Sequence, residues 1–450
     1  MTKADVYGAE LLRTMNTICQ IAGQASVDPM LNEVLVKAEP EREGGVVSFY
    51  STDMSVALEK RLGCDFIDET GEEVETPEGW SIVVQAKQLQ KIAKLFGKLQ
   101  SVYLQPVAPP DGAPATWFQI EGVLHTGKVS KHKIVGLPAE EFPPMPEYDA
   151  GVLQDVAFPV LAEAIRKIIP SMVDNDARKY LNGGLIDISD EKQMFVATDS
   201  HTLAFVDTDI GYTGTLKSGY PDDDVIVPRF TLSMLTCSGV NGAFQVKGKK
   251  WHDIPIVQFG VDRKKLIVAA KGVNGEGITL VSALIDSCYP DYKAVIPKKV
   301  NYSAEVDTKL LLEALKRASV CADPKTHRLE FMFKNGGSNE IHIIGEDCEL
   351  GESHEVVDAV IDDPFGELDK QIEKAVQERE DRAIRDGGEG SPQKMDDYMK
   401  IDYNEVYLSN AISRIGNGKI RIEWLEPTSG IVLKAAADSK DGVIVMPMGR

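Results

Sequence analysis

Apolar residues recur at helical spacing in three parts of the chain, and successive parts begin 150 residues apart. In each part the apolar positions follow steps of four, three and four residues: Leu11, Met15, Ile18 and Ala22; Leu161, Ile165, Ile168 and Met172; and Leu311, Leu315, Ala318 and Ala322. Such a stripe is typical of a helix that buries one face. The pattern therefore predicts three equivalent amphipathic helices.

Further elements follow each of these helices in the same order. Apolar, strand-like runs end at an acidic tripeptide: Ser-Thr-Asp at 51–53, Ala-Thr-Asp at 197–199 and Gly-Glu-Asp at 345–347. A second helix is predicted at about 84–99, 228–238 and 406–415, and each part closes on strands that include 132–138, 277–285 and 441–448. The same order of helices and strands recurs at a regular spacing along the chain, which indicates an internal repeat.

We therefore expect an α+β fold of three repeated domains, each with two helices packed on antiparallel sheets. The expected boundaries are 1–150, 151–300 and 301–450, because the proline-rich segments FPPMPEYDAG and PDYKAVIPKK suit extended connectors. The third domain carries an additional acidic stretch at about 361–397. We interpret this stretch as a solvated surface insertion, and a partner-binding role for it stays open.

Length and composition agree with a folded protein of several domains. The 450 residues are 43% hydrophobic and 26% charged, and no apolar run approaches the roughly 18 residues that a membrane helix needs. The N-terminal segment lacks the apolar region of a signal peptide, and the six cysteines are scattered without a CxxC pair. We expect a cytoplasmic protein without disulfides, metal or cofactor.

The formal net charge of −21 argues against a protein that binds nucleic acid over its whole surface, because phosphates attract basic surfaces. Charge distribution matters more than the sum, however, and one predicted helix is locally basic. A stripe that no acidic residue interrupts is formed there by Lys87, Lys91, Lys94 and Lys98. The stripe is either an ordinary solvated face or a surface that follows a phosphate backbone without reading bases. Phosphate contact is favoured because the first helices of the other repeats are also basic, at Arg166, Lys167, Lys309, Lys316 and Arg317.

One segment invites an enzymatic interpretation. Asp199 and His201 lie two residues apart in VATDSHTLA, and on a strand their side chains would share a face, as in a metal or acid–base site. Together with the aspartates at 222–224 they would suit a metal-dependent nuclease. The equivalent segments at 52–55 and 346–349 contain no histidine, so the recurring aspartate is better explained as a residue that caps a turn. We therefore expect no catalytic residue.

Three parts of the sequence resemble a known family, the β subunit of bacterial DNA polymerase III, which is the replicative sliding clamp. They are ARKYLNGGLIDI with VATDSHTLAF (177–188 and 196–205), YPDYKAVIP (289–297) and the terminal VIVMPM (443–448). The resemblance implies a head-to-tail homodimer in which six similar domains close a ring around double-stranded DNA. It also implies that DNA polymerase III, the clamp loader and other proteins dock short linear peptides on the ring.

By motif position, the resemblance places a hydrophobic peptide pocket at Leu181, Thr198, His201, Leu203, Pro290, Val295, Ile444, Val445, Met446, Pro447 and Met448. Adaptable methionine and aliphatic side chains suit a pocket that accepts several related peptides. The resemblance also implies DNA contacts at Arg178, Lys179 and Tyr180. Subunit contacts are expected between Val320 and Cys321 of one chain and Ile134 of its neighbour.

The chain departs from the family pattern at several positions. Thr202 and Ala294 stand where relatives often carry arginine, so we expect a pocket rim with a different preference for the residues that flank a bound peptide. Ala25 stands where a DNA-contacting arginine can occur, and the chain ends at Gly449 and Arg450. The resemblance thus implies a non-catalytic processivity factor located at replication forks. The alternatives are a metal-dependent nuclease, which a chelator would inactivate, and an acidic interaction scaffold, which would not stay on nicked circular DNA.

Overall fold

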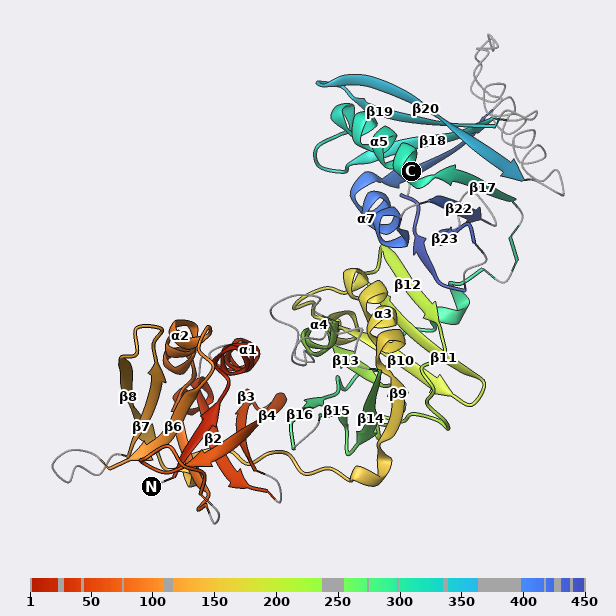
Figure 1. The fold of residues 1–450 in the computed structure, drawn as a ribbon. Helices are drawn as coiled ribbons and strands as arrows, with labels where there is room; N and C mark the ends of the chain where they lie inside the picture. The colour runs from red at the N-terminus through yellow and green to blue at the C-terminus, as the bar shows by residue number, and fades with distance from the viewer. Residues whose placement is uncertain are drawn as a thin grey trace, which may run out of the picture. The chain divides into compact units, whose positions relative to one another are not determined.

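The computed structural model describes most of the chain, and Figure 1 shows its ribbon. The described residues are 2–22, 28–41, 44–74, 77–108, 116–236, 255–272, 275–297, 299–300, 302–334, 339–362, 398–416, 418–424, 430–437 and 440–448. Ala25, residues 363–397 of the expected acidic insertion, Gly449 and Arg450 lie outside the described residues.

The chain divides into two compact units. Unit 1 comprises Met1–Arg166, Ile186–Gln193 and Asp209–Cys288. Unit 2 comprises Lys167–Leu185, Met194–Thr208 and Tyr289–Arg450. The expected division into three domains, with boundaries near residues 150 and 300, stays a prediction.

Six α-helices occur in the described residues, and they lie where the sequence predicts three pairs. The first members are α1 (Gly8–Ile18), α3 (Phe158–Ile168) and α5 (Thr308–Ala318), which begin 150 residues apart. The second members are α2 (Ala86–Phe96), α4 (Arg229–Thr236) and α7 (Glu405–Ile415). Every residue of the three predicted apolar stripes is at most 4% exposed, which confirms the helix predictions. None of these helices is long and apolar enough to cross a membrane.

The first helix of a repeat is anchored at its N-terminus to the segment that follows the second helix. The amide of Gly8 donates to the Leu99 carbonyl at 3.2 Å, and the amide of Thr308 donates to the Gly418 carbonyl at 2.8 Å. A Cβ at Gly8 would lie 2.2 Å from the Phe96 carbonyl oxygen, so this close approach requires glycine. As a result α1 packs beside α2, and α5 packs beside α7 (Figure 1).

The strands of unit 1 form one extended antiparallel sheet in the order β1-β6-β7-β8-β5-β2-β3-β4-β16-β15-β14-β9. Because β1 also pairs with β4, the first eight strands close on themselves. The bounds are β1 (Lys3–Val6), β2 (Glu33–Pro40), β3 (Gly45–Thr52), β4 (Val56–Ile67), β5 (Trp80–Gln85), β6 (Val102–Val107), β7 (Thr116–Val123), β8 (Val129–Leu137), β9 (Gln154–Ala157), β14 (Ile256–Asp262), β15 (Lys265–Lys271) and β16 (Gly277–Ala283), with β13 (Ile226–Pro228) also in this unit.

The strands of unit 2 are likewise antiparallel and follow the order β11-β12-β24-β23-β22-β17-β20-β19-β18-β21. Their bounds are β12 (Thr202–Asp207), β17 (Tyr302–Asp307), β18 (Arg328–Lys334), β19 (Glu340–Asp347), β20 (Gly351–Asp362), β21 (Tyr398–Asn404), β22 (Lys419–Trp424), β23 (Ile431–Ala435) and β24 (Gly442–Val445). The boundary between the units runs through β10 (Gly183–Ser189) and β11 (Lys192–Thr198). Paired helices on antiparallel strands give the α+β class that the sequence predicts.

The three acidic tripeptides end strands and cap the turns that follow them. One carboxylate oxygen of Asp53 accepts the amides of Ser55 and Val56, at 2.8 and 2.7 Å. Asp199 accepts the amides two and three residues later at 2.9 and 2.6 Å, and Asp347 does so at 2.8 and 3.0 Å. The interpretation of these aspartates as turn-capping residues is confirmed.

Candidate functional site

The strand pair β12–β24 brings together two segments that the sequence assigns to the peptide pocket. Thr202 pairs with Val445 and Leu203 pairs with Ile444 in an antiparallel register. The pairing continues past the end of β24, because the amide of Met446 donates to the His201 carbonyl at 3.0 Å. The C-terminal tail is therefore fixed beside the turn that carries His201.

The turn before β12 holds His201 in a defined position. Asp199 caps the turn, and the Thr198 hydroxyl closes it by donating to the Thr202 carbonyl at 2.8 Å. The imidazole of His201 stacks on the ring of Tyr407 with a centroid separation of 4.7 Å and an interplanar angle of 13°. Tyr407 comes from α7 and was not among the residues that the sequence predicted.

Four of the expected pocket residues are buried and can contribute only to its floor. Leu181, Ile444 and Val445 are fully buried, and Leu203 is 7% exposed. A peptide can reach the exposed side chains of His201 and Pro290, and those of Val295 and Met446, which are both 43% exposed. It can also reach the half-buried side chains of Thr198, Pro447 and Met448. The tail is tethered again where the Met448 amide donates to the Asp402 carbonyl at 2.8 Å.

Two tyrosines connect the 289–297 segment to the rest of unit 2. The rings of Tyr289 and Tyr180 meet edge to face with centroids 6.0 Å apart. Burial raises the pKa of Tyr289, and the nearby backbone of Thr198 opposes that rise. The phenol of Tyr289 therefore reaches the turn that carries His201. Tyr292 is also buried, which leaves Pro290 and Val295 as the accessible part of this segment.

Thr202 is 2% exposed, so its side chain is not accessible to a bound peptide, and the expected difference in rim preference stays a prediction. Its hydroxyl lies 2.9 Å from the Asp199 carboxylate and 3.0 Å from the hydroxyl of the fully buried Ser171. The Arg414 guanidinium on α7 donates to the Ser171 hydroxyl at 2.7 Å and to the Pro170 carbonyl at 3.0 Å. Burial lowers the pKa of Arg414, and the charge of Asp199 opposes this shift. A continuous polar network thus runs from α7 to the His201 turn.

The lysine stripe of unit 1 lies on the exposed face of α2 and just beyond its end. Leu89, Ile92, Ala93 and Phe96 bury the opposite face, whereas Lys87, Lys91, Lys94 and Lys98 are all exposed. Among the described residues no carboxylate lies within 4.0 Å of these ammonium groups. Burial raises the pKa of Cys19 to about 11, and the charges of Lys87 and Lys94 oppose that rise, which places both lysines near the end of α1. The stripe is therefore an uncompensated positive surface.

Most of the other basic residues that the sequence assigns to DNA contact already have acidic partners. Arg166 makes two hydrogen bonds to Glu163, at 2.9 and 2.6 Å, and the Lys167 ammonium lies 2.5 Å from Asp441. Arg178 pairs with Asp176 at 3.1 Å, next to the exposed Lys179 and the half-buried Tyr180. On α5, Arg317 pairs with Glu355 at 2.7 Å. These pairs weaken the local positive charge, so the stripe on α2 is the stronger candidate for phosphate contact.

The residues expected at the subunit contact differ in exposure. Val320 is 72% exposed and Cys321 is half-buried, so both offer surface to a partner chain. Ile134 is only 3% exposed within the single chain. On the same strand, Val135 is 57% exposed, and it is a better candidate for such a contact.

The alternative of a metal-dependent nuclease finds no support in the geometry of Asp199. Both of its carboxylate oxygens are engaged by the turn, one by the amides of His201 and Thr202 and the other by the Thr202 hydroxyl. Within the described part of the chain, no group of three or more His, Cys, Asp or Glu side chains could hold a metal ion. Asp199 is thus accounted for by structure alone.

Comparison with known proteins identifies the fold. Residues 155–291 match the family model described as the central domain of the DNA polymerase III beta subunit. A crystal structure of the DNA polymerase III subunit beta from Pseudomonas aeruginosa superposes with a TM-score of 0.74 at 21% identity, covering 100% of both chains. The beta subunit from Thermotoga maritima superposes with a TM-score of 0.73 at 18% identity, again over 100% of both chains. The chain therefore has the sliding-clamp fold.

Sequence relatives agree over nearly the whole length. The beta sliding clamp of Haemophilus influenzae is 21% identical over 97% of this chain and 97% of its own length. The beta sliding clamp of Escherichia coli K12 is 23% identical over 99% of each chain. The chain is therefore similar to beta sliding clamps along nearly its whole length.

Proposed function

We propose that this chain is a DNA sliding clamp, a non-catalytic processivity factor that encircles double-stranded DNA and tethers DNA polymerase III during replication. The observation that carries this proposal is the agreement with beta sliding clamps over 97–99% of the chain, joined to three helix pairs whose first members begin 150 residues apart. A protein that slides must hold DNA without preferring a sequence. Topological enclosure satisfies that requirement, and phosphate contacts add affinity that is independent of sequence.

The proposed ring is a head-to-tail homodimer of chains with three repeated domains each. A heterologous interface between unlike surfaces closes into a ring when its rotation allows. The surface around Val320 and Cys321, which follows α5, would meet the exposed side of β8 around Val135 in the neighbouring chain. Val320 and Val135 are large apolar side chains that are well exposed in the single chain, as an interface of this kind requires.

The lysine stripe is the proposed principal DNA contact. Four exposed lysines on or just beyond one helix, without acidic partners among the described residues, can neutralise phosphates and release their counterions. Arg166, Lys167, Arg178, Lys179 and Tyr180 would contribute less, because three of these five already form ion pairs. The excess negative charge elsewhere on the chain would discourage side-on binding of DNA.

The proposed partner pocket lies in unit 2 and accepts short peptides from DNA polymerase III, the clamp loader and other clamp-binding proteins. Its accessible side chains combine methionine, proline and valine with the stacked His201–Tyr407 pair. Such a surface suits two apolar anchors of an extended peptide. A sliding clamp of Pseudomonas aeruginosa with this fold has been crystallised bound to griselimycin, which makes that compound a suitable probe. We further propose that the protein works in the cytoplasm, at replication forks on the nucleoid.

The pocket is tested by titrating fluorescently labelled griselimycin against point variants of the tail. Each buried apolar anchor contributes roughly 1.5–3 kcal/mol, so Met446→Ala or Met448→Ala should weaken binding by about an order of magnitude. The matched control is Met54→Ala, because Met54 is 71% exposed in the equivalent turn of the first repeat and should not contact the ligand. Unchanged affinity in both tail variants would mean that the pocket is misplaced.

A second variant separates partner binding from assembly. Deletion of residues 446–450 removes both tethers of the tail, to His201 and to Asp402. It should abolish the tight binding of griselimycin and leave the dimer intact, because the proposed subunit contacts lie elsewhere. Conversion to monomer in this variant would show that the tail is chiefly a structural strand.

A further inference from the structure

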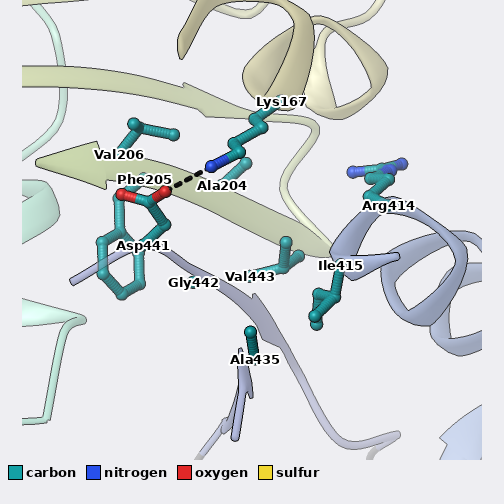
Figure 2. A pocket seen from close by; sticks show the side chains of 10 residues that line it. All are labelled: Lys167, Ala204, Phe205, Val206, Arg414, Ile415, Ala435, Asp441, Gly442 and Val443. Carbon is teal, nitrogen blue, oxygen red and sulfur yellow. Dashed lines mark hydrogen bonds and ion pairs between the residues drawn. The ribbon is translucent and has the colours of Figure 1, made fainter. Parts of the chain in front are cut away.

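Unit 2 contains a cavity that belongs neither to the proposed partner pocket nor to the lysine stripe. It has a volume of about 60 Å³ and lies between the C-terminal ends of α3 and α7, against β12, β23 and β24 (Figure 2). One water needs roughly 10–15 Å³ by this measure, so the cavity has room for a body of several non-hydrogen atoms. Its lining residues are Lys167, Ala204, Phe205, Val206, Arg414, Ile415, Ala435, Asp441, Gly442 and Val443.

The walls of this cavity are apolar. Ala204, Val206 and Val443 are at most 5% exposed and come from the adjacent strands β12 and β24. Ile415 and Ala435 are half-buried and complete the wall toward the end of α7 and β23 (Figure 2). Such walls favour an aliphatic body over a polar one.

The rim carries one more positive charge than negative charge. Figure 2 shows Lys167 directed at Asp441, and these two groups neutralise each other at 2.5 Å. Arg414 stands on the other side of the cavity, and its guanidinium donates hydrogen bonds to the neutral Ser171 hydroxyl and Pro170 carbonyl. Among the described residues no carboxylate lies within 4.0 Å of its guanidinium. The rim is therefore complementary to an anion.

We propose that this cavity binds a small carboxylate with a branched aliphatic body, and that its occupation is coupled to the proposed partner pocket. The coupling follows the polar network from Arg414 through Ser171 and Thr202 to Asp199, which caps the His201 turn. A ligand that engages Arg414 competes for donors that hold this network. This part of the inference rests on the proposed function, whereas binding to the cavity itself does not.

The probe is 3-methylbutanoate, measured by saturation-transfer NMR on the full-length protein. Its neutral and cationic counterparts, 3-methylbutan-1-ol and 3-methylbutan-1-amine, share its body. We expect a dissociation constant in the millimolar range for the carboxylate and weaker binding of the other two. Ala435→Leu fills the cavity and should weaken carboxylate binding by about tenfold. The matched control is Ala436→Leu, since Ala436 is the next residue and does not line the cavity. Absence of binding, equal binding of all three probes, or full binding to Ala435→Leu would each overturn the site.

The coupling is tested by titrating griselimycin with and without saturating 3-methylbutanoate. We expect its affinity to change by about threefold or more, and linkage requires the same factor when the two ligands are exchanged. In Thr202→Val, which breaks the network at a buried position, the factor should fall to one while both ligands still bind. An unchanged griselimycin affinity in the wild-type protein would overturn the coupling. Failure of griselimycin to bind at all would count against the partner pocket and leave the carboxylate measurement standing.

Discussion

At the scale of single residues, the aspartate that ends each acidic tripeptide explains how one turn is built three times. Asp53, Asp199 and Asp347 each accept two amides of the following turn. Of these turns, the one at Asp199 carries the stacked histidine and contacts the C-terminal tail. The same local structure therefore serves stability in one repeat and the proposed partner binding in another.

Replacing the capping aspartate should separate these two roles. Asp199→Ala leaves two turn amides without their acceptor, which should cost about 1–2 kcal/mol of unfolding free energy and also weaken griselimycin binding. Asp53→Ala is the matched control, because it removes an equivalent cap far from the tail in the sequence. Urea unfolding and fluorescence titration measure the two effects. Equal loss of affinity in both variants would contradict a specific role for the Asp199 turn.

Burial of the Lys60 ammonium should make the free energy of unfolding depend on pH. Burial lowers its pKa from 10.5 to about 8, and Glu10 only partly opposes this, because the ammonium has no hydrogen-bond partner among the described residues. Below pH 8 both folded and unfolded chains carry the proton. Between about pH 8 and 10.5 only the unfolded chain carries it, so this group makes stability rise with pH by about 1.4 kcal/mol per unit.

The variant Lys60→Met should be more stable than the wild-type protein below pH 8, because it buries no charge. It should also lack the additional rise in stability above pH 8. Urea unfolding of the two proteins at pH 7, 8 and 9 measures both differences. Parallel pH profiles for the two proteins would show that the Lys60 ammonium is solvated in the folded state.

Residues that depend on distant parts of the chain were those that sequence reasoning missed. Asp199 was interpreted correctly because its environment is local and the other two repeats supply a comparison. Tyr407 and Arg414 escaped because α7 meets the His201 turn only after folding, and no local pattern records that contact. The burial of Thr202 was not predicted, because local sequence alone does not give the burial of a residue at the start of a strand.

At the scale of elements, the helices were predictable because a buried stripe at 3.6-residue periodicity is a strong local signal. Each of the three first helices contains the first three residues of its predicted stripe and ends four residues before the last one. The N-termini of these helices are anchored by hydrogen bonds to residues after the second helix. Strand order was not predictable, because antiparallel pairing of β4 with β16 or of β12 with β24 joins segments far apart in the sequence. Packing of the elements therefore had to come from the structure.

The exposed face of α2 should bind DNA through charge alone. Replacing Lys91 and Lys94 with glutamate should weaken DNA retention and make it less sensitive to salt, because fewer counterions are released. Stability should change little, since both side chains are exposed and lie outside ion pairs in the described residues. The matched control is Lys271→Glu with Lys299→Glu, which changes the charge equally at exposed positions outside the first repeat. Equal weakening in both double variants would show that only net charge matters.

At the scale of the whole molecule, a net charge of −21 and a DNA-binding role are compatible because the charges are unevenly placed. Phosphate contact needs only one basic surface, and the lysine stripe is the surface that we propose for it. The proposed ring has six domains, so the three repeated domains that the sequence predicts in one chain would need a second chain to complete it.

The native mass should therefore be about twice the 49.3 kDa of one chain. Light scattering at micromolar concentration measures it directly. Val320→Glu should shift the equilibrium toward monomer, because Val320 is 72% exposed and would place a charge in the proposed contact. A wild-type monomer, or a dimer unaffected by this variant, would argue against the proposed interface.

Retention on circular DNA tests the enclosure of DNA most directly. The protein is loaded on a nicked circular plasmid with the clamp loader of the same organism and ATP, isolated by gel filtration, and then divided into two samples. One sample is cut once with a restriction enzyme. The protein should stay on the circular DNA at a salt concentration that removes ordinary DNA-binding proteins. On the linear DNA it should be lost, because it slides off the ends. Equal retention on both forms, or release from both, would contradict it.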